Sequence, residues 1–375
     1  MNNSTKRILE VIEKLDLSPT MHQDATTKYQ NICTYLNSKG IEAEFYPQGS
    51  FSFGTVIRPF SQEEDLFYDL DVVCQVHGNK SEVTPLQIKQ SVGNALKDSE
   101  TYKNRLHKED QTCWTLEYAG VDNFDLKLDI VPSVQQDEQE IYRLRLSDLD
   151  PSLANTAISI TKKQRSDHYD WVSSNPKGLT EWFNRINRPF YNSEVNLQKE
   201  MFFKSDANTF ASIEDVPDYV VKSNLQRSIQ FLKRHRDIYF YRIGEVSNKP
   251  SSIVITVLMG LYAENANPAI ELLDLLSGFI GAELKQKRMA SYNPILENPS
   301  QPEDNLLESW SSEMINKFFS WLESLQRELQ EIQKDGIEAI KSVDLILYTE
   351  NLSLSKQYEA PDAKNITIQT RPWRE

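Results

Sequence analysis

The sequence predicts an α+β protein in which a small mixed sheet lobe is followed by a mainly helical lobe. With 375 residues, the chain is long for a single hydrophobic core. Segments with strand character are concentrated between residues 43 and 132, and helical patterns dominate after about residue 150. We therefore expect a first lobe over residues 1–150, including two N-terminal helices, and a second lobe over residues 151–375.

Two amphipathic helices are predicted at the start of the chain, over residues 4–16 and 19–38. Ser18 fits the N-cap of the second helix, Pro19 its first turn, and Gly40 the position just past its end. Strand-like segments follow over residues 43–50, 69–76, 113–119 and 124–132, with a helix expected over residues 84–98.

Longer helices are predicted in the second half of the chain, over residues 217–240, 250–264 and 306–334. The second of these is apolar nearly all round, so we expect it to be buried. The third carries an apolar stripe from Trp310 to Ile332, which is typical of core packing in a helical lobe. The polar tail from about residue 350 is expected to be loosely ordered.

Composition and charge narrow the class of protein. No apolar run is long enough to span a bilayer, so we expect no membrane contact. The acidic residues near the N-terminus do not fit a secretory signal, and the three cysteines have no spacing typical of disulfides or zinc. We therefore expect a cytoplasmic protein. Because phosphate backbones require clustered cations, the net charge of −14 argues against binding of long nucleic acid. An acidic protein can still bind nucleotides through a divalent cation.

Two aspartates stand together on the polar face of the strand predicted at 69–76. Alternate side chains of a strand share a face, so Asp69 and Asp71 lie opposite an apolar face that begins with Leu70 and Val72. Two neighbouring carboxylates repel each other unless a cation lies between them or loop amides bond to both. The pair therefore indicates either a metal site or a hydrogen-bonded turn.

The strand at 124–132 repeats this pattern. Asp125, Lys127 and Asp129 share the face opposite the apolar one. If this strand pairs beside Asp69 and Asp71, a third carboxylate joins them, and spacing alone does not choose between Asp125 and Asp129. Three carboxylates on rigid strands predict a site for two Mg²⁺ ions, with Mn²⁺ as a substitute.

The octet QGSFSFGT at 48–55 contains two of the chain's 12 glycines. A Gly-Ser turn that enters a helix lets backbone amides approach phosphate oxygens closely. We therefore expect Gly49 and Ser50 to bind phosphate, with the Ser50 hydroxyl adding a contact.

A Gly-Ser turn, an Asp-x-Asp strand and a third carboxylate, in this order, resemble the polymerase-β-like nucleotidyltransferases. More narrowly, the chain resembles the cGAS/DncV-like nucleotidyltransferases (CD-NTases) of bacterial anti-phage (CBASS) signalling. The resemblance extends over about residues 45–265 and rests on the segments QGSFSFGTVIRP, EDLFYDLDVVCQV and LKLDIVPSV. It continues weakly in SNPKGLTEWFNRIN, LQRSIQFLKRHRD and KPSSIVITVLMGLYA.

The resemblance implies roles for the residues of the sheet lobe. Asp69 and Asp71 would bind both metal ions, and Asp129 would bind one of them and help to deprotonate the attacking hydroxyl. The Val-Pro that follows matches the family at Asp129 rather than at Asp125.

The resemblance also implies residues that bind the nucleotide: Gln48, Gly49, Ser50, Lys233 and Ser252. Lys233 matches a lysine that reaches the triphosphate from the helical lobe; without the resemblance it reads as a solvated cation. Ser252 matches a cleft serine better than Ser251 does, although either serine also fits a plain helix cap.

The function implied is the joining of nucleoside triphosphates into a cyclic di- or oligonucleotide second messenger for antiviral defence, with release of pyrophosphate. The implied partners are nucleoside triphosphates and a downstream effector that binds the product. Alternatives are nucleotidyl transfer to a tRNA, a protein or a small molecule, a catalytically inactive nucleotide-binding module, and a nucleic-acid-activated sensor. Base choice, product size, linkage, trigger and oligomeric state stay open.

Overall fold

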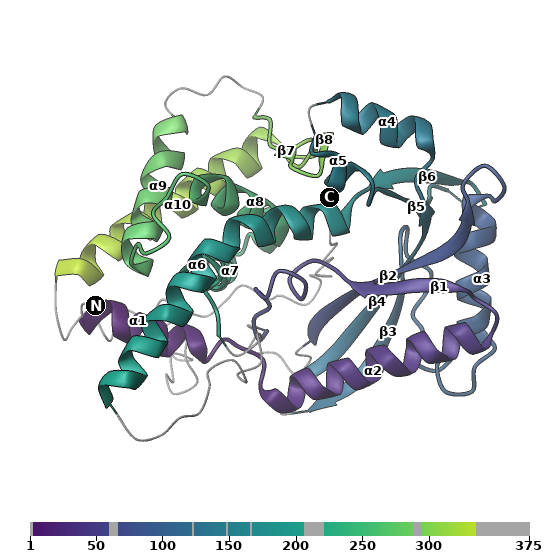
Figure 1. Ribbon diagram of the computed structural model, residues 1–375, viewed down its shortest axis with the longest axis horizontal. Helices are drawn as coiled ribbons and strands as arrows, with labels where there is room; N and C mark the ends of the chain where they lie inside the picture. The colour runs from purple at the N-terminus through teal and green to yellow at the C-terminus, as the bar shows by residue number, and fades with distance from the viewer. Residues whose placement is uncertain are drawn as a thin grey trace.

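The computed structural model describes residues 3–59, 67–121, 124–147, 149–165, 167–205, 221–287 and 294–334. A sheet with its own helices lies beside a group of longer helices (Figure 1). The elements are α1 (Asn3–Glu13), α2 (Pro19–Ser38), β1 (Ala43–Pro47), β2 (Phe67–Asn79), α3 (Pro85–Lys97), β3 (Trp114–Val121), β4 (Phe124–Gln135), α4 (Glu138–Leu146), α5 (Pro151–Ala154), β5 (Ile158–Lys163), β6 (Tyr169–Ser174), α6 (Pro176–Ser205), α7 (Asn224–Arg242), η2 (Val246–Asn248), α8 (Ser252–Ala263), α9 (Leu272–Lys287), β7 (Glu297–Asn298), β8 (Gln301–Asn305) and α10 (Ser312–Lys334).

The large sheet is mixed, as predicted. Its strands run in the order β1-β2-β4-β5-β6, and β3 also pairs with β4. Strands β2 and β4 are parallel, and the other neighbours are antiparallel. Strand β4 is therefore central: along one edge it pairs with β2, and along the other it pairs first with β3 and then with β5.

One face of the sheet is apolar and covered by α2 and α3. Alternate residues of β2 and β4, among them Leu70, Val72, Leu126 and Leu128, form a buried cluster with side chains of these two helices. This is the apolar face predicted from the alternation, so the aspartates lie on the opposite face.

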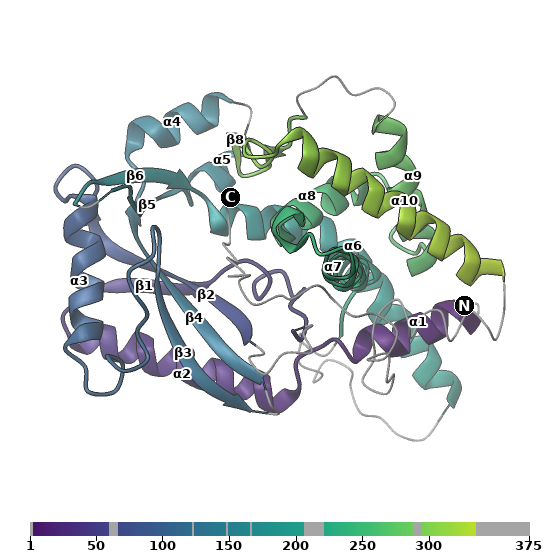
Figure 2. The same cartoon turned by 180° about the vertical axis from the view of Figure 1, so that it is seen from behind.

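A second and larger core holds α1 together with α6–α10. Helix α7 lies at its centre and is buried along most of its length, and Trp321 of α10 is fully buried in the same core. Figure 2 shows α1 among these helices rather than beside the sheet. No helix in the described ranges is long and apolar enough to cross a membrane.

The N-terminal helices follow the prediction closely, whereas strand β1 ends at Pro47 rather than at residue 50. Helix α2 spans 19–38 as expected: Ser18 accepts a hydrogen bond from the amide of Met21 at 3.1 Å, and Gly40 has a φ of 80°. Helix α1 ends at Glu13 rather than at residue 16. The expected helix at 250–264 is α8, and its residues from Ile253 to Val257 are buried as predicted.

The region after residue 150 differs from the predicted pattern of helices. Strands β5 and β6 extend the sheet to Ser174, and β7 and β8 form a separate hairpin. Helix α10 begins at Ser312 rather than at residue 306. Of the helix expected over residues 217–240, residues 221–223 are not helical and α7 begins at Asn224; residues 217–220 and the tail from residue 350 lie outside the described residues. The division into lobes at residue 150 stays a proposal, and a division by sheet pairing would fall at about residue 175.

Candidate active site

Strands β2 and β4 place two of the predicted aspartates side by side. Asp71 is paired with Asp129, and Asp69 is paired with Lys127. In a parallel pair in register, paired residues point to the same face of the sheet. Asp71 and Asp129 are therefore neighbours on the face opposite the apolar one, and Asp69 follows one step along the same face.

The three carboxylates influence one another. Burial raises the pKa of Asp71, and repulsion from Asp129 and then Asp69 raises it further. Burial likewise raises the pKa of Asp129, against a hydrogen bond that the Thr115 hydroxyl donates to its Oδ1. Such crowding disfavours three negative charges at once, and a cation between the carboxylates would relieve it.

Asp125 has a different role. Its Oδ1 accepts a hydrogen bond from the amide of Gly120 at 2.9 Å, where β3 turns into β4. Across the sheet it is paired with Phe67, whereas Asp129 is paired with Asp71. Between the two residues that spacing left open, the structure brings Asp129 beside the Asp-x-Asp pair.

The predicted phosphate-binding turn lies against this carboxylate group. The amide of Gln48 donates to the carbonyl of Asp71 at 3.0 Å, which ties the start of the turn to β2. Gly49 has a φ of 63°, and a Cβ at this position would lie 3.3 Å from Asp71 Oδ2. Glycine at residue 49 therefore permits both the left-handed backbone and the close approach to the carboxylate.

The expected helix after the turn is not formed. Residues 49–54 are turns, in which the amide of Phe53 donates to Gly49 O at 3.1 Å and that of Thr55 to Ser50 O at 2.9 Å. Gly54 has a φ of 66°, which a right-handed helix does not allow. Any anion bound here would meet the amides of a turn rather than a helix N-terminus.

Two buried polar groups at this turn lack partners. The side-chain amide of Gln48 and the hydroxyl of Thr55 have no hydrogen-bond partner in the described part of the chain, although both residues are almost fully buried. Unsatisfied buried groups are rare in proteins and require an explanation. Their position beside Gly49 and Ser50 fits a polar ligand.

Helix α7 holds the backbone that follows the turn. Successive carbonyls accept hydrogen bonds of 2.9 Å from side chains of α7 and of Lys222 just before it: Gln226 to Phe53, Lys222 to Gly54, Lys233 to Thr55, Gln230 to Val56, and Arg234 to Arg58. Spacings of three and four residues put these donors on one face of the helix. The helical core thereby fixes the position of residues 53–58.

Lys233 is buried, so its interpretation as a solvated cation does not hold. Burial lowers the pKa of its ammonium group to about 7. Its contact is the carbonyl of Thr55, which places it beside the predicted turn. Ser252 accepts a hydrogen bond of 3.2 Å from Arg236 Nη1, and Ser251, at the N-cap of α8, makes no side-chain cap bond.

The sequence interpretation did not include Gln226 and Gln230. The only signal was their spacing with Lys233 and Arg234 along one helix, which a solvated face would share. Their function becomes visible once the backbone of residues 53–58 is seen to lie against that helix.

The chemistry of the donor set fits divalent cations. No group of three or more His, Cys, Asp or Glu side chains within the described ranges is spaced so that it would hold a metal ion as it stands. The carboxylates of Asp69, Asp71 and Asp129 nevertheless crowd one face, and carboxylate oxygens are the ligands that Mg²⁺ prefers.

The sequence matches known proteins over this site. The family model described as cyclic GMP-AMP synthase DncV-like, nucleotidyltransferase domain, matches residues 43–130, which include the turn and the three aspartates. A c-di-GMP synthase of Roseivirga ehrenbergii is 31% identical over 346 residues, which cover 88% of this chain and 80% of that protein.

Solved structures share the fold. The CD-NTase CdnG of Bradyrhizobium diazoefficiens, in complex with GTP, superposes with a TM-score of 0.66 at 19% identity, covering 93% of this chain and all of that one. The cyclic AMP-GMP synthase DncV of Vibrio cholerae gives 0.51 at 16% identity, covering 92% and 87% of the two chains. These likenesses confirm the fold predicted from the sequence.

Proposed function

The chain belongs to the DncV-like nucleotidyltransferases, the CD-NTases, and from this premise we propose that it joins nucleoside triphosphates into a cyclic dinucleotide. One observation carries the proposal: Asp71 and Asp129 are paired on adjacent parallel strands, and Gly49 lies against the Asp71 carboxylate. The turn that we propose to bind phosphate thus lies beside a carboxylate group, which supports phosphoryl transfer as the reaction.

GTP is the first substrate to test. The Roseivirga relative is named for a product made of two guanylates, and the Bradyrhizobium neighbour is described in complex with GTP. Neither fact fixes the bases that this chain selects, because base choice depends on a few pocket side chains.

In the proposed step, a ribose hydroxyl oxygen attacks the α-phosphorus of a triphosphate. The new bond joins this oxygen to phosphorus, the bond from the α-phosphorus to the bridging oxygen breaks, and pyrophosphate leaves. Asp129 takes the hydroxyl proton, because its carboxylate lies on the same face as the Asp-x-Asp pair and beside Asp71. Thr115 donates to Oδ1 and so fixes the orientation of this carboxylate.

The nucleotide would be held by the turn and by the helical core. The amides around Gly49, the hydroxyl of Ser50 and the unsatisfied amide of Gln48 would contact the phosphates. Lys233 would add a positive charge from α7, and Ser252 a hydroxyl from the start of α8.

Asp69, Asp71 and Asp129 would hold two Mg²⁺ ions, for which Mn²⁺ can substitute, and such ions, when bound, lower the pKa of a coordinated hydroxyl and neutralise charge on the leaving oxygens. We further propose that the product acts in the cytoplasm as a signal for antiviral defence and is read by a separate effector protein.

The test is a product assay with the purified full chain, Mg²⁺ or Mn²⁺ and all four ribonucleoside triphosphates. A phosphatase-resistant dinucleotide, identified by mass spectrometry and absent with Asp71→Asn, is the expected result. Radiolabel transferred to an added tRNA, protein or small-molecule acceptor would instead support the acceptor-modifying alternative. Tight nucleotide binding without any product would support the inactive binding module.

A further inference from the structure

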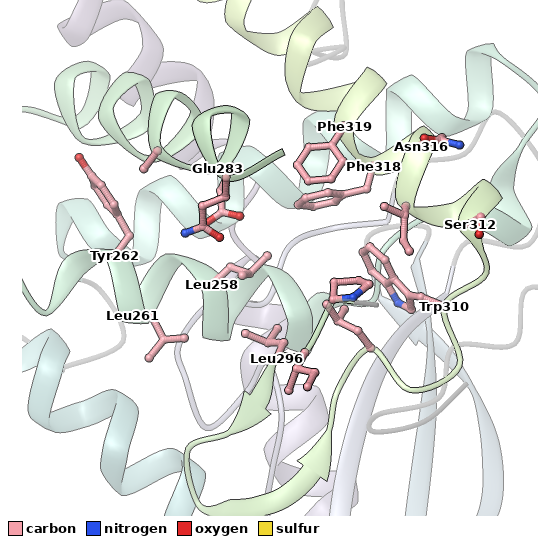
Figure 3. Close-up of a pocket in the computed structure, with 16 residues that line it drawn as sticks. Leu258, Leu261, Tyr262, Glu283, Leu296, Trp310, Ser312, Asn316, Phe318 and Phe319 are labelled. Atoms are coloured by element: carbon pink, nitrogen blue, oxygen red, sulfur yellow. The ribbon is translucent and has the colours of Figure 1, made fainter. Parts of the chain in front are cut away.

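A cavity of about 590 Å³, partly open to solvent, lies at the surface of the helical core, apart from the carboxylate face. It is bounded by α8, α9 and α10 together with residues 294–296 and 307–312 (Figure 3), and its rim includes the exposed side chains of Leu261 and Ile295. This volume is in the range that accommodates small organic molecules. None of the residues predicted to bind nucleotide or metal lines it.

The wall of this cavity is mainly aromatic and aliphatic. Trp310 and Phe318 pack edge to face, with ring centroids 5.4 Å apart, and Tyr262 and Phe319 add two more rings (Figure 3). Leu258 and Leu261 of α8 complete the apolar surface. Such a lining favours a ligand with an apolar or aromatic body.

Glu283 is the exception in this wall. Its side chain lines the cavity, and the residue is only 9% exposed. Within the described part of the chain it has neither a hydrogen bond nor an ion pair, since burial is the only influence on its carboxyl group and raises its pKa to about 7. A buried carboxyl without a partner is costly, and proteins retain such costs mainly where they serve function.

The remaining lining side chains give the cavity a definite charge preference. Among the described lining residues there is no Lys, Arg, His or Asp, and Tyr262 is the only other titratable group. Among these described side chains, an anion such as a nucleotide or a cyclic dinucleotide would meet the carboxylate of Glu283 and no cation. An organic cation would instead gain that carboxylate as a partner of opposite charge.

We propose that this cavity is a binding site for a small organic cation with an aromatic or aliphatic body, whose nitrogen group pairs with Glu283. The aromatic rings of Trp310 and Phe318 would contact the body of the ligand and, where they face the charge, attract it through their π-electrons. The site is distinct from the proposed catalytic face and does not depend on the activity proposed for that face.

Contacts along α8 connect the cavity to the predicted nucleotide site. Leu258, Leu261 and Tyr262 belong to α8, and the first residue of the same helix is Ser252. Ser252 in turn bonds to Arg236 of α7, the helix that holds residues 53–58. A ligand in the cavity therefore contacts a helix that reaches the predicted nucleotide site.

The test compares three probes with one aromatic body by calorimetry on the full chain: naphthylmethylammonium, naphthylmethanol and naphthylacetate. We expect the cation to bind at least about tenfold more tightly than the neutral alcohol, and the anion most weakly. Glu283→Gln should abolish the preference for the cation while leaving the affinity for the alcohol similar. Glu331→Gln, which changes an exposed acid on α10, is the matched control and should keep the preference.

Three results would overturn the proposal. No binding by any probe at millimolar concentration would show that the cavity is not a ligand site. Equal affinities for cation and alcohol would indicate an apolar surface that takes a peptide segment or another protein. A cation preference that survives Glu283→Gln would place the charge recognition elsewhere. Circular dichroism of both variants establishes that each is folded.

Discussion

Gly49→Ala tests the close contact between the turn and Asp71. The backbone at residue 49 has a φ of 63°, and a Cβ there would lie 3.3 Å from Asp71 Oδ2. A side chain at this position therefore does two things: it strains the backbone, and it pushes the carboxylate that pairs with Asp129.

The two effects have different sizes and different readouts. The left-handed conformation costs a residue with a Cβ roughly 1–2 kcal/mol, which lowers the free energy of unfolding by that amount. The contact requires the carboxylate to move by a few tenths of an ångström. Since displacements approaching 1 Å cost about a hundredfold in rate, we expect Gly49→Ala to lower the rate of nucleotide joining about tenfold to a hundredfold.

Gly40→Ala is the matched control. Gly40 has a similar φ of 80°, but a Cβ there would meet no atom within 4 Å. It should therefore lose the same roughly 1–2 kcal/mol of stability and keep its rate. Urea denaturation measures the first quantity, and the initial rate of pyrophosphate release measures the second. A normal rate in Gly49→Ala, or an equal loss of rate in Gly40→Ala, would refute this reasoning.

Four further substitutions test other parts of the account. Asp129→Asn should lower the initial rate by more than about a hundredfold. Asp125→Asn should leave the rate near the wild-type value, because an amide oxygen can still accept the hydrogen bond from Gly120. Equal losses of rate in both variants would contradict the assignment of Asp129 as the third carboxylate of the site. Gln230→Leu leaves the buried Val56 carbonyl without this donor and removes one of the donors to the Asp16 carboxylate, which keeps Lys222 and Arg227, so urea denaturation should show a loss of about 1–3 kcal/mol. The raised pKa of Glu283 means that its proton is held more tightly in the folded state, so the free energy of unfolding should fall as the pH rises from about 4.5 to 7, and Glu283→Gln should lessen that fall. Unchanged pH dependence of unfolding in that variant would show that the carboxyl is not buried in solution.

The sequence was informative wherever a repeating pattern was sufficient. The alternation from Asp69 to Val76, interrupted at Val73, and the strict alternation from Phe124 to Ile130 predicted which side chains share a face, and the structure confirms that apolar face as buried. It also suggested that the two strands pair, which the register of Asp71 with Asp129 shows.

Elements without a clean pattern were missed. Every residue of β6 is half-buried, so the strand shows no alternation. Helix α6 contains Pro189 in its interior, a residue that usually ends a helix. The helix expected after Gly49 was wrong because Gly54 also adopts a left-handed conformation, and a Cβ there would lie 2.5 Å from Gln226 Nε2.

The donors on α7 depend on tertiary contacts that no local pattern encodes. Gln226 and Gln230 are polar residues of a helix, and their partners are backbone carbonyls more than 170 residues earlier in the chain. Only the packing of residues 53–58 against α7 distinguishes them from solvated side chains.

The most direct test of the central claim is the rate at which α-labelled GTP becomes phosphatase-resistant in the wild type and in Asp71→Asn, measured together with the free energy of unfolding of each. The account predicts that the variant loses activity by more than about a thousandfold, and that its stability is unchanged or higher, because the substitution removes one of three repelling carboxylates. A variant that remains active, or one that loses activity only because it unfolds, would contradict the claim that these aspartates form the catalytic centre.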